Sequence, residues 1–325
     1  MASVSITSLA GAILLAAAGP ALAAPLSPAD VFAKASPSVW MVQADHASAG
    51  NGEAGSAVEV GPRTLVTACH VVNGATSVQV SRGQGKAVYP VAQVTHDPDK
   101  GRDLCMLTVN EDLSGAPVAL APPDSVKVGE RVYAIGAPLK LELTLTEGLV
   151  SSLRPNGGEA LPTIQFSAAT APGSSGGGLF DDQGRLVGLT VAIASKETDN
   201  LSFAYPAQWT VELSDRVLAA RKTWLGHLAA AGLPLGPNGD AAASGFAELS
   251  DTTKLPITVA DTKPVIDAYR QFLLLAKPRA FILTSDNRWG AVSDAATLDA
   301  VVKDCAARQV HCRLYAVDDA VVWKP

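Results

Sequence analysis

Charged side chains are scarce in this sequence, and there is no excess of positive charge. Asp, Glu, Lys and Arg make up 17% of the chain, against about 25% in an average soluble protein. The 25 Lys and Arg residues are outnumbered by 31 Asp and Glu, and the net charge is -6. Because a chain without a positive field does not hold phosphates by counterion release, we expect no nucleic acid partner.

The chain also lacks an apolar run of the roughly 20 residues that a membrane span requires. The nearest approach runs from Leu9 to Ala18, within a segment, residues 1–23, that carries no charged side chain and ends in a small-x-small site. This pattern is typical of a secretory signal peptide, although Lys or Arg near Met1 is missing. We therefore expect export to the periplasm or the medium of a bacterium, with no stable membrane anchor after cleavage.

Long helical patterns are missing between Ser38 and Tyr205. This region alternates short apolar runs with turn residues, and the whole chain holds 28 Gly and 21 Pro. Many short strands with turns between them indicate an all-β barrel or sandwich, and the lack of intervening helices argues against parallel βαβ units. The predicted strands are 39–42, 57–60, 64–67, 77–80, 88–94, 104–109, 131–135, 143–153, 164–166 and 186–194.

Helical periodicity begins only after Pro206 and predicts one long helix that closes the first domain at Leu228. A stretch rich in Gly, Pro and Ala then predicts a linker over residues 229–250. The remaining 251–325 read as a small α/β module, with helices at 264–276 and from 293, a strand at 281–283 and a hairpin at 312–323. The mature domains are therefore expected at 24–228 and 251–325.

Four cysteines in an exported chain are an even number that allows three disulfide connectivities. Cys305 and Cys312 are seven residues apart, at the end of a helix and the start of a strand, which suits a local bridge. His311 beside Cys312 is the alternative as a metal site, but no other His or Cys cluster lies nearby in the sequence. We expect the disulfide, and no metal or other cofactor.

Three segments carry residue types that together perform covalent catalysis. A strand ends in Thr67-Ala68-Cys69-His70, an acidic residue opens the strand Asp103-Leu104-Cys105, and a glycine-rich turn holds Gly173-Ser174-Ser175-Gly176-Gly177. A serine hydroxyl needs an imidazole to take its proton, and a carboxylate to orient that imidazole and stabilise the imidazolium. Ser175, His70 and Asp103 are the candidates for these roles. The amides of Gly173 and Ser175 are the candidate oxyanion donors.

The turn Gly173 to Gly177 also has the Gly-x-Ser-x-Gly form of the α/β-hydrolase nucleophile elbow. That fold requires the order Ser, acid, His and a strand-to-helix turn. Only His227 and His311 follow Ser175, and a strand follows Gly178. The candidate residues occur in the order His, Asp, Ser, which differs from the order in that fold. An esterase of the α/β-hydrolase type is therefore the weaker alternative.

These segments resemble the chymotrypsin-like serine proteases, and among them the bacterial HtrA (Deg) protease domain. The resemblance covers roughly residues 30 to 215 and implies two perpendicular six-stranded β-barrels, a closing C-terminal helix and an exported serine endopeptidase that cleaves polypeptides. No Gly-Leu-Gly-type loop of a PDZ domain follows residue 215. The matching stretches are 67–72, 103–107, 132–138, 146–151, 164–169, 173–179 and 188–193.

The resemblance also places Ala169, Ile193 and Ala204 at the specificity pocket. A pocket without a counter-charge implies a preference for a small or medium aliphatic residue before the cleaved bond. Cys69 precedes His70 and Cys105 follows Asp103 by two residues, so contact between His70 and Asp103 would bring the sulfurs together. A second disulfide and two buried free thiols both remain open, as does a catalytically silent scaffold that binds peptides or a partner protein. The oligomeric state is not predicted.

Overall fold

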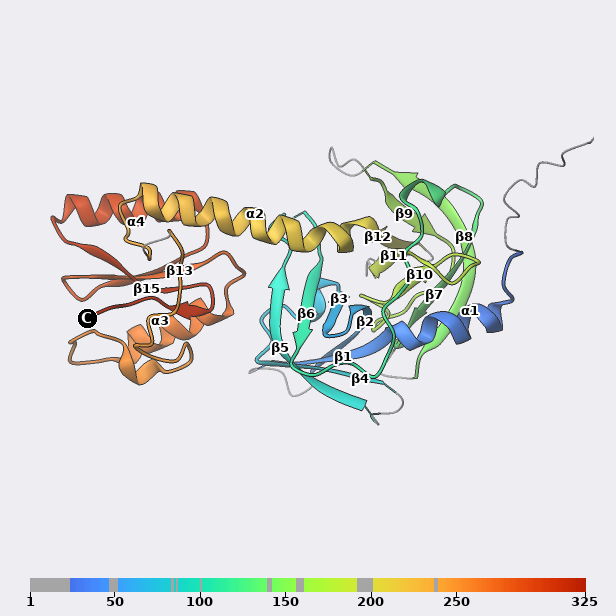
Figure 1. The fold of residues 1–325 in the computed structure, drawn as a ribbon, viewed down its shortest axis with the longest axis horizontal. Helices are drawn as coiled ribbons and strands as arrows, with labels where there is room; N and C mark the ends of the chain where they lie inside the picture. The colour runs from blue at the N-terminus through green and yellow to red at the C-terminus, as the bar shows by residue number, and fades with distance from the viewer. Residues whose placement is uncertain are drawn as a thin grey trace, which may run out of the picture.

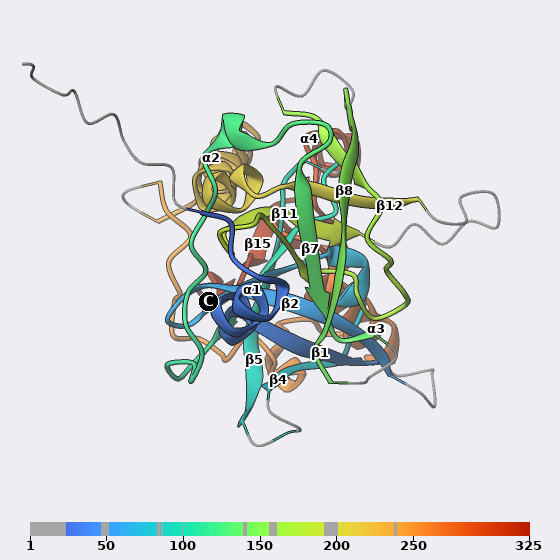
Figure 2. The same cartoon turned by 90° about the vertical axis from the view of Figure 1, so that its right-hand side faces the viewer.

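The computed structural model describes residues 24–46, 52–82, 85, 87–99, 101–138, 142–155, 161–191, 201–236 and 239–325, so the predicted signal peptide lies outside the described residues. Two β-barrels, a long helix and a small α/β unit follow one another along the molecule (Figure 1). Viewed along the long axis, the barrels and helix α1 lie in front of the small unit (Figure 2).

The first barrel is closed, with strand order β1-β2-β3-β6-β5-β4. Antiparallel neighbours satisfy the backbone groups of every strand, and alternate side chains fill the interior. Trp40, Leu65 and Leu107 are among the buried side chains of this core. Its strands are β1 (Val39–Asp45), β2 (Glu53–Gly61), β3 (Thr64–Thr67), β4 (Ser77–Arg82), β5 (Ala87–His96) and β6 (Cys105–Val109).

The second barrel closes in the order β10-β11-β12-β9-β8-β7. Val132, Phe166 and Leu179 belong to its core. Two closed six-stranded antiparallel barrels are the architecture of the chymotrypsin-like fold, and this prediction is confirmed. The strands are β7 (Arg131–Gly136), β8 (Thr144–Arg154), β9 (Thr163–Phe166), β10 (Gly178–Phe180), β11 (Leu186–Val191) and β12 (Ser202–Pro206).

A shared apolar cluster joins the two barrels. Val66 and Leu104 of the first barrel pack in one cluster with Ile135 and Phe180 of the second. The short helix α1 (Pro28–Ala35) adds Val31 to this cluster. Ser27 caps the N-terminus of α1 by accepting a hydrogen bond from Asp30 N at 3.2 Å. The barrels are therefore held in one fixed arrangement, which matters because the candidate site draws residues from both.

Helix α2 (Gln208–Ala230) connects the second barrel to the C-terminal unit. Its first turns bury Trp209 and Leu213 against the barrels, and its last turns bury Trp224 and Leu228. Among the described residues no helix is long and apolar enough to cross a membrane.

The C-terminal unit is a sheet in the order β14-β13-β15-β16 with two helices. One core holds Phe272, Phe281 and Tyr315, and Cys305 is bonded to Cys312. The strand β14 is an element that the sequence analysis did not foresee. The elements are α3 (Lys263–Leu274), β13 (Ala280–Thr284), β14 (Trp289–Val292), α4 (Ala295–Ala307), β15 (Cys312–Val317) and β16 (Ala320–Val321).

The stretch predicted as a linker, 229–250, contributes side chains to a core. Leu233 and Ala241 are buried in one cluster with Ile282 and Leu314 of the sheet. Gly, Pro and Ala in the sequence here indicate close packing and turns, and the described part of this stretch lies against the C-terminal unit.

Candidate active site

The turn after β3 and the start of β6 bring His70 and Asp103 together. His70 lies in the single 3₁₀ turn Cys69–Val71. Its Nδ1 is 2.5 Å from Asp103 Oδ2, and its backbone N–H donates to Asp103 Oδ1 at 2.8 Å. Cys69 N also donates to the backbone oxygen of Asp103 at 3.3 Å. The carboxylate is therefore held on both oxygens by one turn, which fixes the plane of the imidazole.

This pair shifts the pKa of both groups in the direction that favours an ion pair. The hydrogen bond to Asp103 raises the pKa of His70, against a smaller lowering by burial. Burial by itself would raise the pKa of Asp103, but hydrogen bonds and charge from His70 outweigh it and lower that pKa. Asp103 is thus an anion at neutral pH, and it stabilises positive charge on the imidazole.

The glycine-rich turn before β10 presents Ser175 from the second barrel. Gly173 and Gly176 have φ of +98° and +82°, a region that side chains with a Cβ rarely adopt. A Cβ on Gly176 would lie 2.1 Å from Ser56 O and 3.0 Å from Ala68 N. Only a glycine permits this approach, so the turn that holds Ser175 packs directly on the strand end that leads into His70.

Two hydroxyl groups hold the Ser175 turn in place. Ser56 Oγ donates to Gly173 O at 2.8 Å, and Ser56 N donates to Ser175 O at 2.8 Å. From the other side, Thr190 Oγ1 donates to Ser174 O at 2.6 Å. Neither Ser56 nor Thr190 was predicted to position the site, although Thr190 lies in the matching stretch 188–193.

A disulfide joins the 3₁₀ turn of His70 to strand β6, which follows Asp103. Cys69 and Cys105 are bonded, with a Cα–Cα distance of 4.8 Å, so the structure has a bridge and not two free thiols at this position. His96, paired with Cys105 across β5 and β6, completes a group of three possible metal ligand atoms that lie within 4.8 Å of one another. Since both sulfurs are bonded to each other, this group offers no thiolate to a metal.

Two of the three residues placed at the specificity pocket, Ala169 and Ala204, are among the described residues, and they differ in exposure. Ala169 is exposed, and its carbonyl accepts a hydrogen bond from Thr146 Oγ1 at 2.8 Å. Ala204 is 0% exposed and packs in the barrel core with Ile164 and Val187, so its methyl group faces inward instead of lining an open pocket. Ile193 lies outside the described residues.

Residues 55–189 match the family model of the trypsin-like peptidase domain. The chain is 33% identical to the anti-sigma-I factor RsgI9 of Acetivibrio thermocellus over 49% of this chain and 22% of that protein. It is 30% identical to the periplasmic serine endoprotease DegP of Escherichia coli K12 over 53% of this chain and 36% of that protein. The chain therefore spans well under two thirds of these curated relatives.

Solved structures give the same relationship. The HtrA-type protease AlgW with a tripeptide is 29% identical and superimposes with a TM-score of 0.51, over 59% of this chain and 63% of that one. The region matched by the family model, residues 55–189, contains His70, Asp103 and Ser175. Residues 55–189 are therefore similar to the trypsin-like peptidase domain, and about half of the chain is similar to HtrA-type serine proteases.

Proposed function

We propose that this protein is an exported serine endopeptidase in which Ser175 attacks the peptide carbonyl. His70 takes the proton from Ser175 and later gives it to the leaving amine, while Asp103 orients His70 and stabilises its positive form. The observation that carries this proposal is the doubly bonded His70–Asp103 pair. The turn of Ser175 packs through Gly176 on the strand end that leads into His70. No cofactor enters this chemistry.

The amides of Gly173 and Ser175 are the proposed oxyanion donors. In the peptide unit between Ser174 and Ser175, the carbonyl is held by Thr190 Oγ1 at 2.6 Å and by Gly177 N at 3.0 Å. Because the N–H and C=O of a trans peptide point in opposite directions, the Ser175 N–H points away from Thr190 and β11. This orientation supports its use as a donor to the tetrahedral intermediate, where a lost donor costs about 2.7 to 4 kcal/mol.

Polypeptides are the proposed substrates, with a small or medium aliphatic residue before the cleaved bond. DegP is called a serine endoprotease and AlgW was solved with a tripeptide, which supports the substrate class. Ala169 supports the preference because it is exposed and uncharged, whereas the buried Ala204 does not contribute to it. One methylene in such a pocket is worth about 1 to 3 kcal/mol, so the preference among aliphatic residues should be modest.

Export to the periplasm or the medium completes the proposal. Residues 1–23 have the pattern of a signal peptide, and the relative DegP is named as periplasmic. The Cys69–Cys105 and Cys305–Cys312 disulfides suit an oxidising compartment.

Labelling with a fluorophosphonate probe, followed by casein and peptide cleavage, tests the enzyme. The wild type should be labelled and should cleave casein, while Ser175→Ala should lose labelling and about 10⁴-fold or more of its activity. If both forms equally lack labelling and cleavage, the protein is a silent scaffold and the enzyme proposal fails. In the peptide series, best turnover with Arg or Lys before the cleaved bond would reject the proposed pocket.

A further inference from the structure

Asp97, six residues before Asp103, is a buried carboxylate whose partner comes from a different part of the chain. Its side chain is 0% exposed. Arg216 of α2 donates from Nε to Asp97 Oδ2 at 3.1 Å and to Oδ1 at 3.3 Å, and its Nη2 also bonds to Oδ2. An ion pair formed through a guanidinium fork fixes direction as well as distance, because both carboxylate oxygens are engaged.

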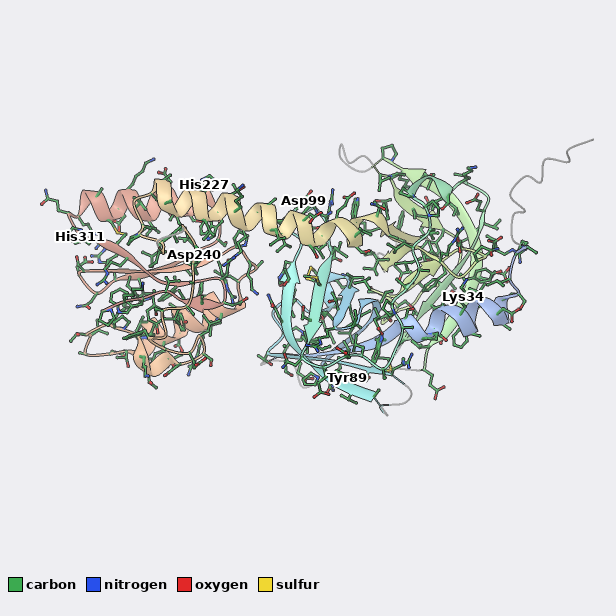
Figure 3. The ribbon with its side chains drawn as sticks, in the orientation of Figure 1. Lys34, Tyr89, Asp99, His227, Asp240 and His311 are labelled. Carbon is green, nitrogen blue, oxygen red and sulfur yellow. A yellow bond between two sulfur atoms is a disulfide. The ribbon has the colours of Figure 1, made fainter. Side chains whose placement is uncertain are left out.

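Asp97 in turn organises the connection between β5 and β6, which ends in Asp103. Asp97 Oδ1 accepts from Asp99 N at 3.0 Å, and Asp97 N donates to Leu104 O at 2.9 Å. Asp99 is labelled in Figure 3. Leu104 follows Asp103 directly, so the backbone of Asp97 holds the residue next to the proposed triad carboxylate. The side chain of Asp97 holds the turn that precedes Asp103.

A second contact ties the same connection to α2. The guanidinium of Arg102 lies 4.4 Å from the ring centroid of Trp209, and the ring of Tyr205 stacks on Trp209 at 5.0 Å. Arg216 Nη2 also donates to the backbone oxygen of Trp209 at 3.0 Å. The two α2 residues that contact this connection, Trp209 and Arg216, are therefore also bonded to each other, about two helical turns apart.

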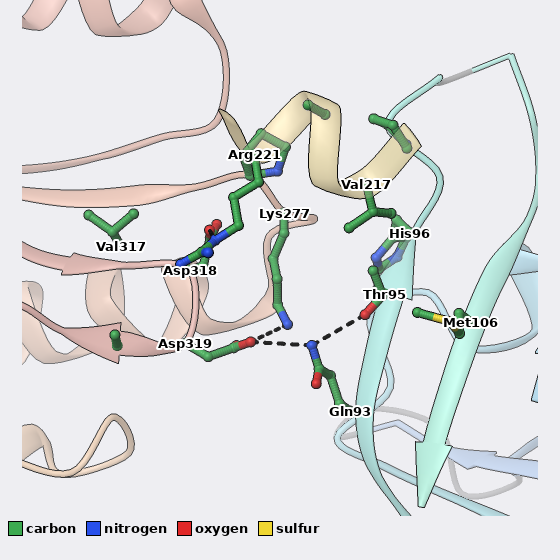
Figure 4. Close-up of a pocket in the computed structure, with 14 residues that line it drawn as sticks. Gln93, Thr95, His96, Met106, Val217, Arg221, Lys277, Val317, Asp318 and Asp319 are labelled. Atoms are coloured by element: carbon green, nitrogen blue, oxygen red, sulfur yellow. Dashed lines mark hydrogen bonds and ion pairs between the residues drawn. The ribbon is translucent and has the colours of Figure 1, made fainter. Parts of the chain in front are cut away.

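The other half of α2 belongs to the C-terminal unit. Trp224 and Leu228 lie in one core with Ile282, and Arg221 Nε is 3.2 Å from Asp318 Oδ2. A cavity of about 360 Å³ lies where this unit meets β5 and α2 (Figure 4). Across it Asp319 bonds to Lys277 and to Gln93 Nε2, the latter at 3.4 Å. One rigid helix therefore joins the C-terminal unit to the loop that carries Asp103.

We propose that Asp97 and Arg216 are positioning residues for Asp103, and that through them α2 and the C-terminal unit form part of the scaffold of the active site. This inference rests on the proposed function. Neither residue touches the substrate. Their role is to keep the Asp103 carboxylate at hydrogen-bond distance from His70, since small displacements of catalytic groups lower rates steeply.

A shift of Asp103 should be visible in the titration of His70. The charged groups that act on His70 are Asp103, whose hydrogen bond raises its pKa, and Glu53, whose charge adds to this rise. Asp103 faces His70, and its charge also acts on Tyr205 and on His96. Withdrawal of the carboxylate would leave burial as the main influence on the imidazole, and the pKa of His70 would fall.

The test compares Arg216→Gln, Arg216→Lys and Asp97→Asn with the wild type. Peptide kinetics, corrected for active enzyme by fluorophosphonate titration, and the His70 pKa from NMR are measured for each variant. We expect Arg216→Gln to lower kcat about 10-fold to 100-fold with little change in KM. The acid limb of its pH profile should move to lower pH, and Arg216→Lys, which keeps the charge without the fork, should recover part of the loss.

Arg63→Gln is the matched control, because it breaks an ion pair with Asp112 on the same barrel. This pair is on the surface, with the Arg63 side chain 59% exposed and the Asp112 side chain 69% exposed. It should leave kcat and the His70 pKa unchanged. An unchanged His70 pKa and kcat in Arg216→Gln and Asp97→Asn would overturn the positioning role. A wild type that is not labelled would refute the proposed function alone, since the NMR titration still decides whether Arg216 positions Asp103.

Discussion

Asp103 makes three hydrogen bonds with two consecutive residues, Cys69 and His70. Two of them end on its carboxylate oxygens, so the side chain has little freedom to rotate. The imidazole is held in the tautomer that carries its proton on Nδ1, which leaves Nε2 to accept the proton of a nucleophile. At this scale the site is a carboxylate and an imidazole, held together by one turn and the start of one strand.

Replacing Asp103 by Asn removes the charge but keeps the size of the side chain. The hydrogen bond to Asp103 raises the pKa of His70 above its ordinary value of about 6.5. The kcat/KM of the wild type should therefore decrease as the pH is lowered, with a midpoint above that value. In Asp103→Asn that midpoint should move to lower pH because the protonated imidazole loses its anion. The plateau rate should drop by about 10⁴-fold, since the amide favours the wrong tautomer.

Kinetics of peptide cleavage between pH 5 and 9 measure both effects in one series. The double variant Asp103→Asn with Ser175→Ala supplies the background rate that must be subtracted. A midpoint that stays at the wild-type pH would contradict the claim that the hydrogen bond to Asp103 raises the pKa of His70.

At the scale of elements, the site depends on a turn from one barrel that packs on a strand end of the other. The turn before β10 approaches β2 and β3 so closely that a Cβ at Gly176 would lie 2.1 Å from Ser56 O and 2.3 Å from Thr67 Oγ1. Ser56 and Thr190 then hold the turn from both sides by hydrogen bonds to its carbonyls. The position of Ser175 is thus a property of the contact between barrels and not of its own loop alone.

Gly176→Ala should therefore destabilise the protein and reduce its activity. A positive φ costs a residue with a Cβ about 1 to 3 kcal/mol, and the clash with backbone atoms of β2 adds to this cost. Gly129→Ala is the matched control, because Gly129 has φ +90° and no atom within 4 Å of its Cβ position. Denaturant unfolding should show a larger loss for Gly176→Ala, and equal losses would mean that the close approach does not matter.

The elements that sequence patterns predicted are those whose signal is local. Alternating runs in the barrels and the helical period from Trp209 to Leu228 repeat within a few residues, and these elements are present. Strand β14 has four residues with Gly290 in its interior, and a glycine inside a short strand weakens the strand pattern. The family resemblance gives a position along the chain but not the face of the strand that is inside, so Ala204 was placed at the pocket although its methyl group lies in the core.

Long-range pairs had no such signal. Asp97 and Arg216 are 119 residues apart, and each by itself reads as an ordinary surface charge. His70, Asp103 and Ser175 were candidates because their types, order and flanking sequence carry the chemistry of a triad. Asp97 and Arg216 came together only in the folded chain.

At the scale of the whole molecule, α2 is shared by two cores. Trp209 and Leu213 lie in the cluster between the barrels, and Trp224 and Leu228 lie in the cluster of the C-terminal unit. The helix runs without a break from Gln208 to Ala230. The C-terminal unit is therefore fixed to the two barrels by a rigid element, to which the described part of residues 229–250 adds buried side chains such as Leu233.

Leu228→Ala tests how strongly this shared helix contributes to stability. Leu228 is 0% exposed, so its truncation leaves a cavity and should lower the free energy of unfolding by about 2 to 5 kcal/mol. Leu218→Ala on the same helix is the matched control, because Leu218 is 63% exposed and its truncation should cost no more than about 0.5 kcal/mol. Both substitutions replace the same side chain and leave helix propensity equal, so urea unfolding compares burial alone. Equal unfolding curves for the two variants would mean that the C-terminal unit does not pack on α2 in solution.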